Sequence, residues 1–272
     1  MALVLYEAPA YTPLTSPTRI FDLPHSGRVT ISQHWGEDGT RTGGAVWDAA
    51  QVLGHYIDEH HERWMNQSSL ELGAGMGFAS IVAARCGFTD VLATDGDANL
   101  LSFARSNADE NAEAHGNAAT VRVETLQWGD TAALNTLLPL GAATPDVILA
   151  SDVIYLGSAR SWGSFLSLVA TLCRRRREEM STASTSVLFG VAPAVPPPAP
   201  IARHDGTFSA AGDPLVLLSH TRRYANEEQH FFGEARRHRF NVTELPENAL
   251  HATWAGGRSV LYELRWLGDS HA

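Results

Sequence analysis

The chain has 272 residues, of which 30 are Asp or Glu and 20 are Lys or Arg, so its formal net charge at pH 7 is −10. This balance argues against a general nucleic-acid binder, because affinity for phosphate backbones requires an excess of basic side chains on one face. With 44% apolar and 18% charged residues, the composition is that of a globular protein with a substantial core, which excludes wholesale disorder.

The cysteines and the hydropathy pattern indicate the compartment. Cys86 and Cys173 have no CxxC spacing, so we predict neither a disulfide framework nor a cysteine-based zinc site. A reducing environment fits, and we expect the protein in the cytoplasm or the nucleus. The sequence has no run of about 18 apolar residues and no signal-peptide pattern, so we expect no membrane association. Nothing in the composition requires a dimer, and we expect a monomer.

The first part of the chain combines an extended arm with one strand and one helix. A Pro- and Thr-rich arm precedes RVTISQHW (28–35), in which Val29, Ile31 and Gln33 alternate with polar residues as in a half-buried strand. From Trp47, apolar residues recur at spacings of three and four, which predicts a helix that faces the core. We therefore expect residues 1–45 to form an N-terminal arm with a β-strand.

The middle of the chain alternates short apolar strands with helical segments. Such alternation implies right-handed βαβ crossovers and a mainly parallel sheet that is buried on both faces. The sequence thus predicts an α/β fold with a Rossmann-like, doubly wound sheet. The predicted strands are 69–72, 91–95, 120–126 and 146–152, and the predicted helices are 77–86, 97–114 and 130–138.

A further helix and a Pro-rich insertion follow. The helix runs from about 159 to 179 and contains four successive arginines, 174–177, near its predicted end. Cations at a helix C-terminus complement the helix dipole, and we favour this role over contact with an anionic partner. Residues 181–213 form the Pro-rich insertion, and we predict its tract VAPAVPPPAPIARHDG (191–206) to be polyproline II or surface loop.

The last part of the chain completes the predicted sheet. Residues 214–221 read as a strand and 227–239 as a helix, and the strands 240–245 and 259–266 are close enough to pair antiparallel. We predict seven strands, mostly parallel with the last antiparallel, in one domain over residues 46–272. The segment 186–192 is an alternative for the fifth strand.

The sharpest local signal is ELGAGMG (71–77), between a predicted strand and a predicted helix. Glycines there allow a tight turn and let a ligand approach bare backbone. Gly73, Gly75 and Gly77 are evenly spaced, unlike the dinucleotide fingerprint, and Glu71 precedes them. A nearby carboxylate disfavours a diphosphate and favours a cationic ligand, and S-adenosylmethionine, with its ammonium and sulfonium groups, fits. Asp95 ends the next strand, where an acidic side chain can hold a ribose diol, whereas Asp97 is predicted to cap the following helix.

Several motifs resemble one known family. ELGAGMG, ATDGD (93–97), LQWGD (126–130) and SDVIY (151–155) resemble the seven-β-strand, class I methyltransferases. Together with TGGAVWDAAQVLGHYI (42–57) and the segment from SHTRR (219–223) onward, they resemble methyltransferase family 16, in particular its methyltransferase-like 21 group of protein-lysine methyltransferases. The resemblance implies S-adenosyl-L-methionine as cofactor, S-adenosyl-L-homocysteine as product and a protein as substrate. The long insertion at 181–213 departs from the family pattern.

The resemblance also implies roles for individual residues. Gly73, Ala74 and Gly75 would line the methionine and ribose portions of the cofactor, Glu71 would support the loop, and Asp95 would hold the ribose hydroxyls. Trp128 would lie beside the adenine, Ser151 would close the pocket, and Trp47 would reach over the cofactor.

Two more residues, Asp152 and Tyr155, would act on the substrate as the catalytic pair. Asp152 would attract and align the target lysine, and Tyr155 would provide an aromatic wall and a hydroxyl acceptor. Core packing for Trp47 and Trp128, and a turn-capping role for Asp152, are the structural alternatives.

Other readings of the sequence stay open. A class I methyltransferase could instead act on histidine, an N-terminal amine, a small molecule or RNA, and a cofactor-binding module without turnover is a third class. We expect no metal site, because His55, His60 and His61 do not have the i, i+4 spacing of helical zinc ligands. His220, after a predicted strand, is interpreted as a satisfied polar group near the crevice.

Overall fold

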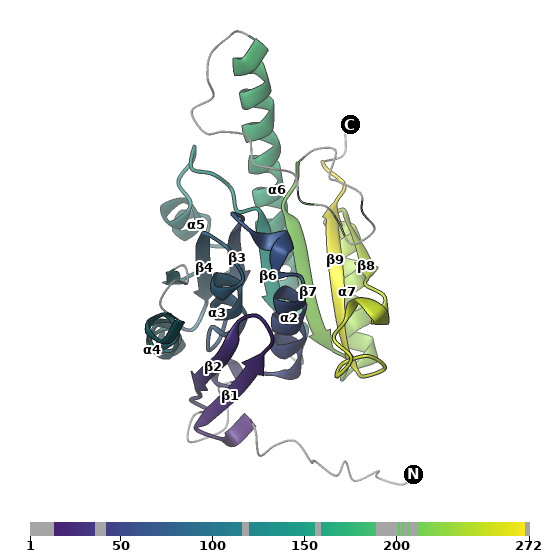
Figure 1. Cartoon of the computed structure of the whole chain (residues 1–272). Helices are drawn as coiled ribbons and strands as arrows, with labels where there is room; N and C mark the ends of the chain where they lie inside the picture. Colours follow the sequence, from purple (N-terminus) through teal and green to yellow (C-terminus); the bar gives the residue numbers. More distant parts are fainter. Residues whose placement is uncertain are drawn as a thin grey trace.

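The computed structural model describes residues 14–35, 42–115, 120–155, 159–188, 201, 203, 206 and 212–269 (Figure 1). Within these residues, a seven-stranded sheet has the spatial order β5-β4-β3-β6-β7-β9-β8. β9 is antiparallel to β7 and to β8, and the other neighbours are parallel, which confirms the predicted fold class. The strands are β3 (Ser68–Leu72), β4 (Asp90–Asp95), β5 (Val121–Thr125), β6 (Val147–Ser151), β7 (Leu215–Thr221), β8 (Phe240–Glu244) and β9 (Ser259–Trp266).

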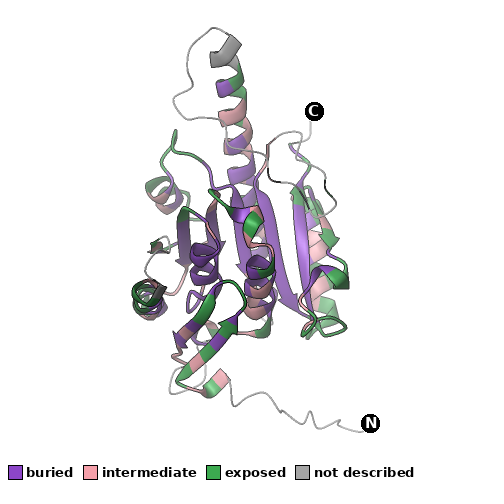
Figure 2. Cartoon of the chain, in the orientation of Figure 1, coloured by how far each residue is buried: buried purple, intermediate pink, exposed green. Residues whose placement is uncertain are grey.

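Helices cover both faces of this sheet. One core cluster joins α2, α3 and α4 to one face, and a second joins α5, α6 and α7 to the other. Successive side chains of β7 enter the two clusters in turn: Leu215 and Leu217 belong to the first, and Val216 and Leu218 to the second. The central strands are therefore buried throughout, as Figure 2 shows. The helices are α2 (Asp48–Glu59), α3 (Phe78–Arg85), α4 (Ala98–His115), α5 (Thr131–Leu137), α6 (Ala159–Leu188) and α7 (Ala225–Arg237).

An antiparallel hairpin precedes the sheet. β2 (Gly27–Ser32) matches the predicted strand, and it pairs with β1 (Thr18–Leu23), which we did not predict in the Pro- and Thr-rich arm. Two asparagines of α4 anchor the hairpin: Asn107 accepts from the Ser32 amide at 2.8 Å and Asn111 from the Thr30 amide at 3.1 Å. The backbone of β2 is thus satisfied without joining the central sheet.

Helix α6 is longer than predicted and extends beyond the sheet in Figure 1. Because it ends at Leu188, the four arginines lie inside the helix, and the explanation by the helix dipole is wrong. They make separate polar contacts instead: Arg174 with Asp269, Arg175 with the Leu138 carbonyl, Arg176 with Asp146 and the Thr144 carbonyl, and Arg177 with Asp213.

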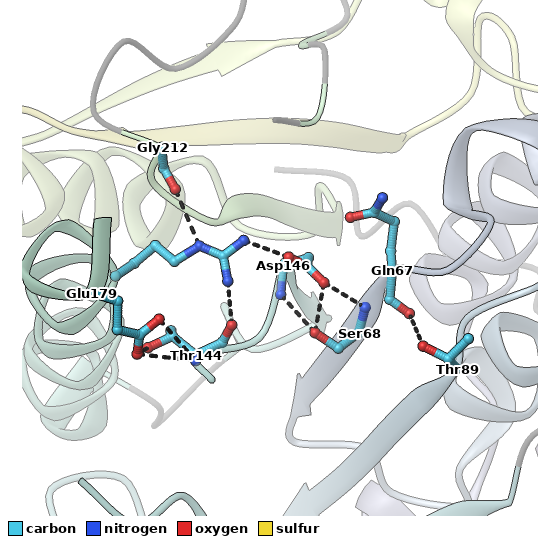
Figure 3. A network of polar contacts seen from close by, with 8 residues as sticks. Gln67, Ser68, Thr89, Thr144, Asp146, Glu179 and Gly212 are labelled. Atoms are coloured by element: carbon cyan, nitrogen blue, oxygen red, sulfur yellow. Dashed lines mark hydrogen bonds and ion pairs between the residues drawn. The ribbon is translucent and has the colours of Figure 1, made fainter. Parts of the chain in front are cut away.

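The contacts of Arg176 belong to a polar network beside the start of β6 (Figure 3). Asp146 also accepts from the amide and hydroxyl of Ser68, both at 2.7 Å, and Thr144 donates to Glu179. The network ties α6 to the amino ends of β3 and β6. The arginine run is therefore a structural feature of the described part of the chain.

The first part of the predicted insertion is helical. Residues 181–188 are helical, so the alternative that places the fifth strand at 186–192 is wrong for 186–188, and 189–192 lie outside the described residues. β7 is the strand next to β6. Most of the predicted polyproline tract, 191–206, also lies outside the described residues, but Arg203 forms a buried ion pair with Glu263 of β9.

Candidate active site

A cavity of about 720 Å³ opens where β3, β4 and β6 end. In open parallel sheets this edge is where ligands bind, and the volume suits a ligand of nucleoside size. The structure brings all ten predicted site residues together in the lining. These are Trp47, Glu71, Gly73, Ala74, Gly75, Asp95, Trp128, Ser151, Asp152 and Tyr155.

The glycine loop after β3 forms one wall of bare backbone. Gly73 and Gly75 have φ of +78° and +52°, a region that side chains with a Cβ rarely adopt. A Cβ on Gly75 would lie 2.7 Å from the carbonyl oxygen of Gly43. The amides of Gly73 and Ala74 both donate to the Thr94 carbonyl at 2.9 Å, which ties the loop to β4. Glycine is therefore required at position 75 by conformation and by space.

Glu71 lies buried beneath this loop. Its carboxylate accepts from the amide and the hydroxyl of Ser80, at 3.0 and 2.5 Å. Burial raises the pKa of Glu71 to about 7; the hydrogen bonds from Ser80 act against this, and the charge of Asp95 adds to it. A cationic ligand in the cavity would favour the ionised form of this carboxyl.

Asp95 and Asp97 lie at the carboxyl end of β4 and in the turn that follows it. Asp95 accepts from the amides of Gly75 and Asp97, each at 2.9 Å, so it links the glycine loop to the turn after β4. Asp97 accepts from the amide of Asn99 at 2.9 Å and caps the start of α4, as predicted. The role of Asp95 toward a ribose stays a prediction.

Two tryptophans line the cavity. Trp128 is half-buried, packs edge to face against Phe165 at 5.1 Å, and lies 3.4 Å from the position of a Cβ on Gly73. Trp47 precedes α2, is also only partly buried, and donates from its indole nitrogen to the Thr42 carbonyl at 2.6 Å. Trp128 packs against the core cluster that α5, α6 and α7 form with the sheet, and it also lines the cavity. The roles of both tryptophans toward a cofactor stay predictions.

Asp152, directly after β6, has a backbone φ of +55° and a nearly buried carboxylate. Arg223 donates to it twice, at 2.8 and 2.7 Å, and the Thr221 amide lies 3.3 Å from Oδ1. Burial by itself would raise the pKa of Asp152, but His220 and Arg223 outweigh it and hold this pKa below its ordinary value. Asp152 is therefore a charged acceptor in the folded protein. Tyr155 stands nearby at the rim and is 43% exposed.

Arg223 and His220 show where reading the sequence fell short. We assigned Arg223 no role, although it follows β7 in SHTRR and lines the cavity. His220 is buried beside Asp152, and its Nε2 has no hydrogen-bond partner among the described residues. Its Nδ1 lies 3.5 Å from Oδ1 of Asp152. The signal that could have found both residues is their position at the carboxyl end of a strand beside β6.

The described residues contain no group of three or more His, Cys, Asp or Glu side chains that could hold a metal ion. No described helix has the length and apolarity to cross a bilayer. Cys86 and Cys173 are both buried and unbridged.

Comparison with known proteins gives a consistent picture. Residues 25–189 match the lysine methyltransferase family. Protein N-lysine methyltransferase METTL21A of Danio rerio is 34% identical over 192 residues, which cover 70% of this chain and 78% of that protein. Protein-lysine N-methyltransferase EEF2KMT of Homo sapiens is 31% identical over 202 residues, 69% of this chain and 58% of that one. Among solved structures, the SAM-dependent methyltransferase from Agrobacterium tumefaciens has a TM-score of 0.48 at 16% identity, covering 92% of this chain and 70% of its own.

Proposed function

The chain belongs to the lysine methyltransferase family and is an S-adenosylmethionine-dependent protein-lysine methyltransferase, and we propose that the cavity at the ends of β3, β4 and β6 is its active site. The observation that carries this proposal is the convergence of the glycine loop, Asp95 and Asp152 on one cavity. We propose that the cofactor binds against the loop and that the lysine enters past Asp152 and Tyr155.

The residues present fit this cofactor. Gly73 and Gly75 line the cavity with bare backbone, and the carboxyls of Glu71 and Asp95 suit a ligand with positive charge and hydroxyl groups. Trp128 offers a flat apolar surface for a base. When bound, S-adenosylmethionine supplies a methyl group on a sulfonium for in-line transfer.

The chain's own residues must then prepare the acceptor. A lysine ammonium has a reference pKa near 10.4, so presenting the free amine at neutral pH costs roughly 4 to 5 kcal/mol. Partial burial and a neighbouring cation both lower this cost. Since the pKa of Asp152 is held low, Asp152 is poorly suited to act as a base. We propose that it accepts a hydrogen bond from the lysine nitrogen and aligns it, while Tyr155 flanks the side chain.

The substrate is proposed to be a protein with a basic surface, which the net charge of −10 would attract. The sequence helps the test, because it contains no lysine and all 20 basic residues are arginine. Lysine label in an assay therefore cannot come from the enzyme itself.

The test is incubation of the purified protein with tritiated S-adenosylmethionine and a cell extract, followed by mass spectrometry of the labelled band. We expect methyl-lysine in a protein. We expect Asp152→Asn to lower transfer by at least about tenfold, as for loss of a group that positions the reactant, with little change in calorimetric affinity for S-adenosylhomocysteine. Asp22→Asn, in an exposed ion pair of β1, is the matched control. Label on metabolites or on histidine, or full activity of Asp152→Asn, would contradict the proposal.

A further inference from the structure

We propose that Arg223 is a positioning residue that fixes Asp152 and Trp47 at the cavity mouth and neutralises the Asp152 carboxylate, so that the site receives lysine as a free amine rather than as an ammonium. The inference rests on the proposed function of this cavity. It assigns a role in the reaction to a residue that follows β7, outside the glycine loop and the SDVIY segment.

The geometry of Arg223 joins three elements. Its two terminal nitrogens donate to the two oxygens of Asp152 at 2.8 and 2.7 Å, a bidentate pair that fixes the plane of the carboxylate. The guanidinium carbon lies 5.0 Å from the centre of the Trp47 ring, within cation–π range. One side chain therefore connects the end of β6, the start of α2 and the end of β7. Asp152 also has a positive φ, which costs a non-glycine residue free energy, and the pair with Arg223 helps to offset that cost.

The ionisable groups around Arg223 and Asp152 set the charge that a substrate amine would encounter in the cavity. Arg223 is the only basic side chain among the described residues that line the cavity. Beside the pair stand His220 of β7, which approaches Asp152, and Asp48 of α2 and Tyr224, which interact electrostatically with Arg223. The remaining ionisable groups of the lining are Glu71, Asp95, Asp97 and Tyr155.

The paired carboxylate has a chemical consequence. An isolated Asp152 would stabilise a lysine ammonium and raise the pKa of the target lysine, which opposes methyl transfer. Paired with Arg223, the carboxylate keeps lone pairs that can accept a hydrogen bond, but the net charge of the pair is zero. Asp152 can then align an amine without holding it in the unreactive protonated form.

The test is the pH dependence of methyl transfer in Arg223→Gln. Removing the positive charge should raise the pKa of the bound lysine, so that the rising limb of the kcat profile moves up by about one pH unit. At pH 7.5 kcat should fall about tenfold, and it should recover near pH 9.5. Arg222→Gln is the matched control, because Arg222 is adjacent in sequence but pairs with Glu228 and Glu244 and does not line the cavity.

Two results would overturn the inference. An equal loss of rate at every pH, together with a lowered melting temperature, would mean that Arg223 serves only the fold. A lower KM with an unchanged pH profile would mean that Arg223 merely competes with the substrate for Asp152.

A binding measurement separates this inference from the proposed function. Because Arg223→Gln leaves the Asp152 charge uncompensated beside the cavity, the ratio of affinities for cationic S-adenosylmethionine over S-adenosylhomocysteine should rise by about threefold or more in calorimetry. This ratio needs no protein substrate. If the parent enzyme methylated no lysine, the proposed function would fall, whereas an unchanged ratio would reject the neutralising role of Arg223.

Discussion

Replacing Glu71 by Gln should remove a pH-dependent cost to the fold. Burial raises the pKa of Glu71 from 4.5 to about 7, so the folded protein holds this proton more tightly than the unfolded chain does. Stability therefore falls as the pH rises from 4.5 toward 7, and above 7 the full cost remains. At about 1.4 kcal/mol per pH unit, the difference between the two pKa values amounts to about 3 kcal/mol.

The side chain of Gln keeps an oxygen that can accept both hydrogen bonds from Ser80 but has no charge to bury. The free energy of unfolding of Glu71→Gln, relative to the parent, should accordingly rise by about 2.5 kcal/mol between pH 5 and pH 8. Urea unfolding at a series of pH values measures this difference, and comparison with the parent cancels the titration of all other groups.

The control is Glu110→Gln. Glu110 also accepts a hydrogen bond from a serine, Ser106, at 2.9 Å, but it is exposed on α4. The free energy of unfolding of Glu110→Gln should stay within about 1 kcal/mol of the parent value, because solvent screens an exposed carboxylate. If the free energies of unfolding of Glu71→Gln and the parent differed by the same amount at pH 5 and pH 8, ionising the Glu71 carboxyl would cost the fold nothing. The view that this buried carboxyl gains from a cationic ligand would then be refuted.

Two further substitutions have matched controls within the chain. Gly75→Ala should abolish detectable binding of S-adenosylhomocysteine in calorimetry and lower the melting temperature. The reason is that Ala at this position would combine a φ of +52° with a Cβ 2.7 Å from the Gly43 oxygen. The control is Gly141→Ala, which has a φ of +91° but no atom within 4 Å of the added Cβ, and it should leave binding intact. Arg176→Ala should destabilise the fold by about 3 to 5 kcal/mol in urea unfolding, because it leaves the nearly buried Asp146 without its charged partner. The control, Arg174→Ala, breaks an exposed ion pair and should cost less than about 1 kcal/mol.

The parts of the fold that sequence predicted well are those governed by local patterns. The apolar runs that became β3, β4 and β6 were placed within one or two residues, because a buried parallel strand between turn residues has few alternatives. The glycine loop was also predictable, since evenly spaced glycines after a strand express a backbone requirement. The ten proposed site residues lie at or just after the carboxyl ends of strands or precede a helix, and the sheet topology gathers them.

The parts that sequence did not predict depend on contacts between distant segments. Arg223 meets Asp152 across 71 positions, and no periodicity encodes such a pair. β1 was missed because its pairing with β2, which the asparagines of α4 hold in place, stabilises it rather than its own composition. Helix α6 continues past residue 179 although Ser and Thr are frequent there, and the hydroxyls of Thr182 and Ser184 donate to the carbonyls four residues earlier in the helix.

The two ends of β6 explain why one Arg–Asp pair is structural and another is proposed to act in the reaction. Asp146 precedes the strand and Asp152 follows it, and each is paired with an arginine, Arg176 and Arg223. The sequence DVILASD makes the two aspartates look equivalent. The parallel sheet distinguishes them, because ligands bind only beyond the carboxyl ends of its strands. Arg176 of α6 is accordingly nearly buried, whereas the side chain of Arg223 remains 29% exposed and lines the cavity, so only the second pair can meet a substrate.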